Sequence, residues 1–135
     1  MKTHYIAICS KQSLPKIRAF VEGELRALEV KEMVKHQLVL AVDEACANSI
    51  IHQHECDEQA RIKLSISRKG QELMIELTDE GAPFPINEYE PQKLSEIIKN
   101  RTKGGLGIFL INQIMDKVEV IERKDHFVYR FIKYI

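Results

Sequence analysis

Two polar residues with chemical potential stand close together in the stretch LAVDEACANSIIH, residues 40–52. Glu44 and Asn48 are four residues apart, so on an α-helix their side chains lie on the same face, one turn apart. A carboxylate and an amide placed in this way can share a water molecule or a hydrated metal ion. The alternative is that both residues belong to a solvated stripe and have no common role.

A second candidate lies in IELTDEGAPFP, residues 75–85, where an alternating strand pattern runs into Asp79 and then Gly81. An aspartate at the end of a strand can direct its carboxylate at a hydrogen-bond donor in a pocket. The glycine allows a backbone or a ligand to come close. The alternative is a plain strand terminator, because Asp, Gly and Pro all favour turns.

The third candidate is TKGGLGIFLINQIMD, residues 102–116, which holds three of the six glycines, at Gly104, Gly105 and Gly107. Glycines before a helix leave backbone N–H groups accessible at its positive end, which favours anions and above all phosphate. The stretch is neither a Walker A motif nor a dinucleotide-binding fingerprint, since it lacks the Gly-Lys-Ser/Thr and the preceding strand. A flexible hinge that caps a helix is the alternative.

The elements that position these residues follow from the hydrophobic spacing. We expect a strand over 4–9, helices over 13–30 and about 31–52, a hairpin of strands over 61–67 and 72–78, a helix over about 105–116, and two strands over 117–123 and 126–135. Ser13 is expected to cap the first helix. A second apolar band that includes Leu40 predicts a central helix buried over much of its circumference.

This order predicts an α+β two-layer sandwich, with a mixed, mainly antiparallel sheet and the helices on one face. The length of 135 residues suits one domain over 1–135, and the long segment of about 80–103 is typical of a lid. The C-terminal aromatic residues share the strand alternation, which favours core packing over a base-stacking platform.

Composition excludes several classes of function. The formal net charge is zero, which argues against direct binding to nucleic acid or to a membrane. The apolar stretches are too short to span a bilayer, and the first residues lack the pattern of a signal peptide. Three widely spaced cysteines form no disulfide framework, which indicates a cytoplasmic protein.

Taken in order, the three stretches resemble the boxes of the GHKL ATP-binding fold, shared by gyrase and the histidine kinases. The likeness covers nearly the whole chain and is greatest to the anti-sigma factor serine/threonine kinases. It implies that Asn48 holds Mg²⁺, that Glu44 is the general base, and that Asp79 binds the adenine amino group of ATP. By the same resemblance Gly81 lets the base approach.

The glycine box would contact the phosphates. The resemblance implies that Gly104, Gly105 and Gly107 let the lid close on ATP and that the N–H of Leu106 is among the donors. Lys103 stands where several of these kinases have arginine, and lysine can neutralise a γ-phosphate but cannot grip it as a planar fork.

The resemblance therefore implies a protein kinase that uses ATP and Mg²⁺ to phosphorylate an anti-sigma-factor antagonist protein, and that sequesters a sigma factor. Family members commonly dimerise, so we expect a homodimer. The alternative is a nucleotide-sensing protein-binding module without kinase activity. A histidine kinase is disfavoured, because only about thirty residues precede the helix that carries Glu44.

Overall fold

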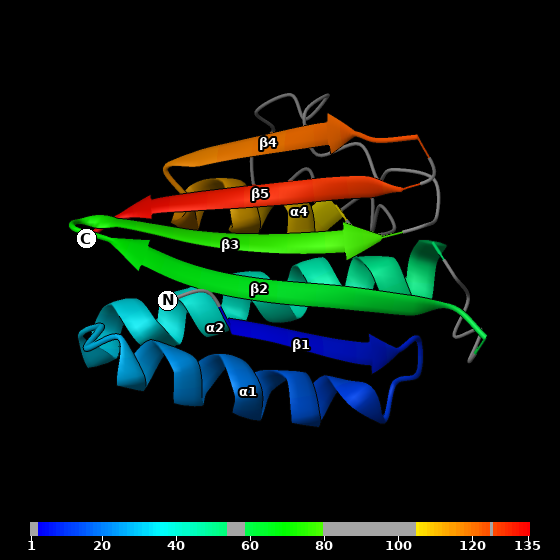
Figure 1. The fold of residues 1–135 in the computed structure, drawn as a ribbon, viewed down its shortest axis with the longest axis horizontal. Helices are drawn as coiled ribbons and strands as arrows, with labels where there is room; N and C mark the ends of the chain where they lie inside the picture. The colour runs from blue at the N-terminus through cyan, green and yellow to red at the C-terminus, as the bar shows by residue number, and fades with distance from the viewer. Residues whose placement is uncertain (1–2, 54–58, 80–104, 125) are drawn as a thin grey trace.

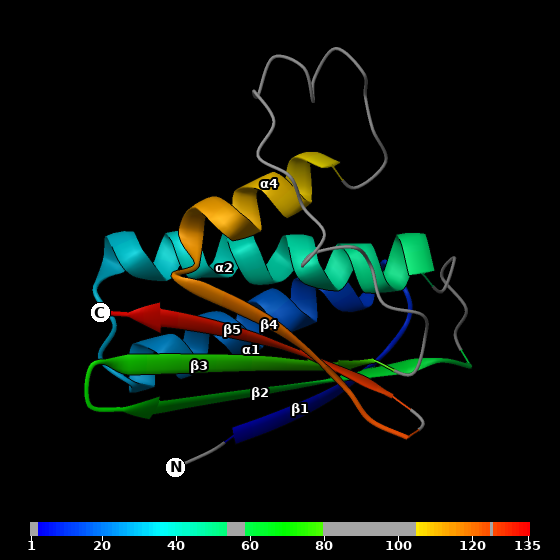
Figure 2. The same cartoon turned by 90° about the horizontal axis from the view of Figure 1, so that it is seen from above.

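The computed structural model describes residues 3–53, 59–79, 105–124 and 126–135. The strands form one layer and the helices a second layer (Figure 1 and Figure 2). The elements, in chain order, are β1 (Thr3–Ile8), α1 (Ser13–Ala27), α2 (Glu32–Ala47), the π-helical turn η1 (Asn48–Gln53), β2 (Arg61–Lys69), β3 (Glu72–Asp79), α4 (Gly105–Ile114), β4 (Lys117–Glu122) and β5 (Phe127–Tyr134). The expected element order is confirmed, and the bounds differ by a few residues.

The five strands form one sheet in the order β1-β2-β3-β5-β4. Every neighbouring pair of described strands is antiparallel, so the sheet has no parallel pair in this part of the chain. Gly70 turns the β2–β3 hairpin with a φ of +60°, a conformation that favours glycine. The predicted α+β class is confirmed, with the helices on one face of the sheet (Figure 2).

The core lies between the sheet and the helices because alternate strand residues point toward the helix layer. Leu64 on β2, Leu77 on β3 and Tyr129 on β5 are all buried on this side. Leu77 pairs with both of the others across the ladder. Tyr129 and Phe131 pack in the core and Phe127 packs against it, which confirms the prediction for these C-terminal aromatic residues, whereas Tyr134 is exposed.

The ends of α1 are set by backbone geometry rather than by a serine cap. Ser13 is the first residue of α1 and is buried, and the preceding residue, Gln12, makes no side-chain cap hydrogen bond. The expectation that Ser13 is the cap was therefore wrong. The serine oxygen used at this turn is Oγ of Ser10, which accepts from the backbone N–H of Gln12 at 3.3 Å.

Helix α2 is less buried than its apolar pattern suggests. Its inner side, with Leu38 and Val42, is fully packed, yet Leu40 remains 41% exposed and Met33 76% exposed. The predicted burial over much of the circumference is therefore wrong on the outward side of the N-terminal half of α2, but it is confirmed over residues 41–50, none of which is exposed. The helices on either side, α1 and α4, both contact α2, and the remaining side faces away from the sheet (Figure 2).

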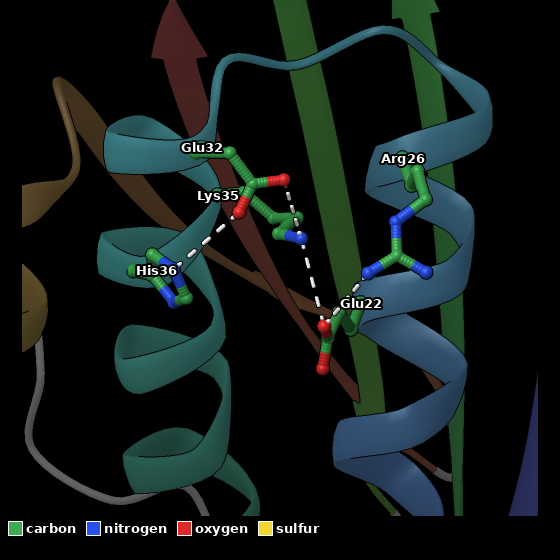
Figure 3. A network of polar contacts seen from close by, with 5 residues as sticks. All are labelled: Glu22, Arg26, Glu32, Lys35 and His36. Carbon is green, nitrogen blue, oxygen red and sulfur yellow. Dashed lines mark hydrogen bonds and ion pairs between the residues drawn. The ribbon is translucent and has the colours of Figure 1, made fainter.

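A charged network joins α1 to α2 near the start of α2 (Figure 3). Nζ of Lys35 lies 3.0 Å from Glu32 Oε1 and 3.5 Å from Glu22 Oε1, although the lysine itself is buried. Glu22 also contacts Nη2 of Arg26 at 3.0 Å on its own helix. The lysine therefore links the two helices and holds the N-terminal half of α2 in place.

Candidate functional site

The three stretches identified in the sequence meet at one end of the molecule. Helix α2 ends, strand β3 ends and helix α4 begins at the right-hand end of Figure 1, and Figure 2 shows the same arrangement from above. Helices α2 and α4 are in contact and run in opposite directions, which brings the first turn of α4 to the end of α2 that carries Asn48. The fold therefore gathers the candidate residues that the structure describes.

Glu44 lies in the last turn of α2 and is partly buried. Burial raises the pKa of its carboxyl group above the usual value of 4.5, and the neighbouring carboxylate of Asp43 raises this pKa further. Asp43 itself contacts Nε of Arg18 on α1 at 2.9 Å. A carboxylate with a raised proton affinity is suited to accept a proton from a hydroxyl group.

Asn48 follows α2 directly and its side chain is buried. Its amide nitrogen Nδ2 donates to the backbone oxygen of Glu44 at 3.0 Å. Because only the NH₂ group can donate to a carbonyl, this bond fixes the orientation of the amide and turns Oδ1 away. That oxygen is a suitable ligand for a hard cation such as Mg²⁺.

Asp79 is the last residue of β3 and is completely buried. It follows the alternation of Ile75 and Leu77, whose side chains are in the core, so its carboxyl group points toward the helix layer. The pKa of the Cys46 thiol on α2 is raised, chiefly by burial and also by the carboxylates of Asp43 and Asp79. The carboxylate of Asp79 is therefore close to the last turn of α2, which contains Cys46.

Sequence reasoning missed two features next to Asn48. The chain changes there from α-helix to the π-helical turn η1, a feature that is frequent at functional sites. Oγ of Ser49 is buried and has no hydrogen-bond partner among the described residues. Nothing in the apolar spacing indicates the change of helix type.

The glycine box is described only from its second glycine onward. Gly105, Leu106 and Gly107 form the first turn of α4, where the backbone N–H groups have no partner within the helix. Gly81, Lys103 and Gly104 lie outside the described residues. The positive end of α4 lies in the same half of the molecule as the end of α2 (Figure 2), and a helix N-terminus favours a phosphate.

The described residues fit a nucleotide with Mg²⁺ better than a resident metal ion held by protein side chains. No group of three His, Cys, Asp or Glu side chains that could hold a metal occurs among them. Mg²⁺ is usually held by one or two protein oxygens together with phosphates and water, and Oδ1 of Asn48 can supply one such oxygen. Also within the described part, no helix is long and apolar enough to cross a membrane.

Comparison with known proteins agrees with this geometry. Over 87 residues, 62% of this chain, the sequence is 38% identical to the serine-protein kinase RsbW of Halalkalibacterium halodurans, and it covers 52% of that relative. It is 32% identical over 85 residues to the anti-sigma F factor of Clostridium perfringens, of which it covers 61%. The chain thus spans about half of the first relative and three fifths of the second.

Solved structures with low sequence identity share the fold. The RsbU and RsbW domains of Rv1364c from Mycobacterium tuberculosis match 99% of this chain and 32% of that one, with a TM-score of 0.70 and 11% identity. The SiaB–SiaC complex from Pseudomonas aeruginosa contains a chain that matches with a TM-score of 0.68 and 15% identity, over 96% of this chain and 88% of that one. The family model described as the histidine kinase-like ATPase domain matches residues 10–133, and the chain belongs to that family.

Proposed function

We propose that the protein is a cytoplasmic serine/threonine protein kinase that phosphorylates an anti-sigma-factor antagonist protein, using ATP and Mg²⁺, and that sequesters a sigma factor. The observation that carries this proposal is the pairing of Glu44 and Asn48. Nδ2 of Asn48 donates to the backbone oxygen of Glu44, which leaves Oδ1 for another ligand, and the carboxyl group of Glu44 on the same helix face has a raised pKa. The names of the relatives, a serine-protein kinase and an anti-sigma F factor, support the same assignment.

Each residue has a role in the proposed site. The buried carboxylate of Asp79 accepts a hydrogen bond from the adenine amino group, and Oδ1 of Asn48 holds Mg²⁺. The first turn of α4, which contains Gly105, Leu106 and Gly107, offers its N–H groups to the phosphates. Gly81 gives room to the base, while Lys103 and Gly104 complete the phosphate contacts.

In the proposed reaction the protein accepts one proton from the acceptor hydroxyl group. The carboxylate of Glu44 takes the proton from the acceptor hydroxyl as the hydroxyl oxygen bonds to the γ-phosphorus of ATP and the bond to ADP breaks. Mg²⁺ would neutralise phosphate charge during this step. Burial of Glu44 suits the role, because a raised pKa makes its carboxylate a better proton acceptor.

The test compares wild type with Glu44→Gln. We would measure transfer of labelled phosphate from ATP to a panel of purified antagonist proteins, and ATP binding by calorimetry. A kinase loses about 10²- to 10⁴-fold in transfer when its general base is removed, and keeps its affinity for ATP. Asp43→Asn is the comparison variant: it removes the adjacent carboxylate, which pairs with Arg18 and raises the pKa of Glu44, so it should slow transfer far less than Glu44→Gln does.

The outcome also decides between the two functional classes. If wild type binds ATP and a partner but transfers no phosphate to any member of the panel, the protein is a nucleotide-sensing binding module. If Glu44→Gln transfers phosphate as fast as wild type does, Glu44 is not the base. A homodimer remains our expectation, and sedimentation of the purified chain with and without ATP tests it.

A further inference from the structure

The outward face of α2 carries exposed apolar side chains on the same stripe as the proposed base. Met33, Gln37, Leu40 and Glu44 are spaced by four, three and four residues, which places them on one side of the helix. Met33 is 76% exposed and Leu40 is 41% exposed, whereas Leu38 on the inner side is fully buried. We call Met33, Gln37 and Leu40 the outer stripe.

We propose that the outer stripe of α2 is the docking surface for the protein substrate, and that Leu40 contacts an apolar side chain beside the acceptor hydroxyl. This proposal rests on the proposed function, because it assigns the occupant from the position of Glu44. Any hydroxyl group that reaches the carboxylate of Glu44 along α2 must pass over the residue one turn before it. That residue is Leu40.

The spacing sets what the partner must present. One helical turn rises about 5.4 Å, so Leu40 lies roughly that far from Glu44 along the helix axis. An extended chain advances about 6.8 Å in two residues, and residues two apart point to the same side. The side chain that packs on Leu40 therefore belongs two positions from the acceptor residue when the partner segment is extended.

Met33 extends the surface beyond the reach of a short segment. It is eleven residues before Glu44, which corresponds to about 16 Å along the helix. A second part of the partner's surface must cover it. The expected occupant is thus a folded protein that presents a hydroxyl group and at least two apolar side chains, in agreement with a protein substrate rather than a small molecule.

The charges beside the stripe indicate that the contact near Leu40 is apolar rather than ionic. Asp43, the charged residue of α2 adjacent to Glu44, already pairs with Arg18 at 2.9 Å. Further along, Lys35 is buried between Glu22 and Glu32, and the exposed Glu32 beside Met33 also contacts Nε2 of His36 at 3.5 Å. Binding of a partner to the stripe is therefore favoured by the burial of Leu40 and Met33. The partner does not have to supply a counter-charge for Asp43 or Lys35, because both are already paired.

A single exposed apolar residue is common on protein surfaces and needs no explanation. Two such residues on the stripe that ends at the candidate base are a different observation. The exposed apolar residue Ile6, by contrast, lies on β1, where the neighbouring Ala7 points into the core. Ile6 therefore faces away from the helix layer and offers a matched control.

The experiment measures phosphotransfer to the best antagonist protein of the panel for four chains: wild type, Leu40→Gln, Met33→Gln and the control Ile6→Thr. Glutamine keeps the helix propensity of α2, and threonine that of the strand. We expect Leu40→Gln to raise KM for the partner by about tenfold. We expect a smaller rise for Met33→Gln, and unchanged kcat and ATP affinity in both variants. Ile6→Thr should behave as wild type.

A second measurement separates docking from turnover. In the Glu44→Gln background transfer is slowed by about 10²- to 10⁴-fold, so calorimetry with ATP present reports mainly partner binding. Adding Leu40→Gln to this background should weaken partner binding by the same factor as it raises KM. Unchanged binding in this double variant would overturn the docking surface, even if KM changes.

The remaining outcomes are distinct. If Leu40→Gln lowers kcat and leaves KM unchanged, Leu40 acts on the chemical step and the docking surface is wrong. If wild type transfers phosphate and all three variants match it, the docking surface is wrong while the proposed function stands. If wild type binds ATP but phosphorylates no member of the panel, the proposed function fails and the docking surface fails with it.

Discussion

The buried Lys35 between α1 and α2 is the subject of a stability prediction. Removing its ion pairs is expected not to lower the free energy of unfolding. Lys35→Met should leave the free energy of unfolding unchanged or raise it by up to about 2 kcal/mol. Methionine is unbranched and of similar length, so it can fill the same space. The two carboxylates that Lys35 contacts are on exposed side chains of Glu22 and Glu32 and can return to water.

The magnitude follows from the burial of each partner. The side chain of Lys35 is only 2% exposed, and the effective cost of burying an ammonium group is several kcal/mol. Against this stand contacts at 3.0 Å and 3.5 Å whose carboxylates are 71% and 46% exposed, so water screens both of them. The attraction therefore only roughly offsets the burial.

Removing the two carboxylates instead of the lysine should lower the stability of the fold. The double variant Glu22→Gln/Glu32→Gln keeps the buried ammonium group and removes both counter-charges, so it should lower the melting temperature. Thermal unfolding followed by circular dichroism measures both variants, and for 135 residues about 1 kcal/mol corresponds to roughly 4 °C. If Lys35→Met lowers the melting temperature by more than the double variant does, the network is a net source of stability and the reasoning is refuted.

Three further changes test the helix ends. Glu29, at the C-terminus of α1, has a φ of 61°, and the N–H of Val30 after it donates to Leu25 O at 3.0 Å. Glu29→Gly should therefore raise the free energy of unfolding by about 1 kcal/mol, whereas Glu29→Ala should leave it unchanged. Urea unfolding measures both variants. Because the pKa of Glu44 is raised in the folded protein, its contribution to stability is fully present when the pH is below the usual pKa of 4.5. This contribution is lost as the pH rises through the raised pKa. Glu44→Gln should therefore raise the melting temperature at pH 7.5 but not near pH 4. Asn48→Ala should abolish the dependence of ATP affinity on Mg²⁺ and leave metal-free binding nearly unchanged, as measured by calorimetry.

The sheet was predictable where one face of a strand is buried. The alternation of Ile62, Leu64 and Ile66 predicted β2, and all three residues are in the core. The hairpin turn was predictable from Gly70, which adopts the positive φ that such a turn needs. The sequence does not indicate the order of the strands, because the pairing of β3 with β5 joins segments that are separated by residues 80–126, which include α4 and β4.

Local irregularities escaped sequence reasoning for physical reasons. A serine before a helix predicts a cap, but the hydroxyl that bonds to the backbone at this turn belongs to Ser10, three residues before Ser13. The π-helical turn after Ala47 leaves no trace in the apolar pattern. Leu40 counts as apolar in any periodic pattern, and only the structure shows that it faces away from the core.

The candidate site was predictable as three separate stretches, each with an ordinary alternative. The structure brings Glu44, Asn48 and Asp79 to one end of the molecule and orients the amide of Asn48 by its bond to Glu44 O. This hydrogen bond is not visible in the spacing, which shows only that the two residues share a helix face.

The most direct test of the central claim is calorimetric titration of ATP with Mg²⁺ into wild type and into Asp79→Asn. Asp79 is completely buried, and a hydrogen bond to a charged group contributes about 1.5–3 kcal/mol, so the variant should bind ATP roughly 10- to 150-fold more weakly. Affinity for GTP should change little in comparison. Equal affinity of the two proteins for ATP, or no binding by wild type, would contradict the assignment of this end of the molecule as the nucleotide site.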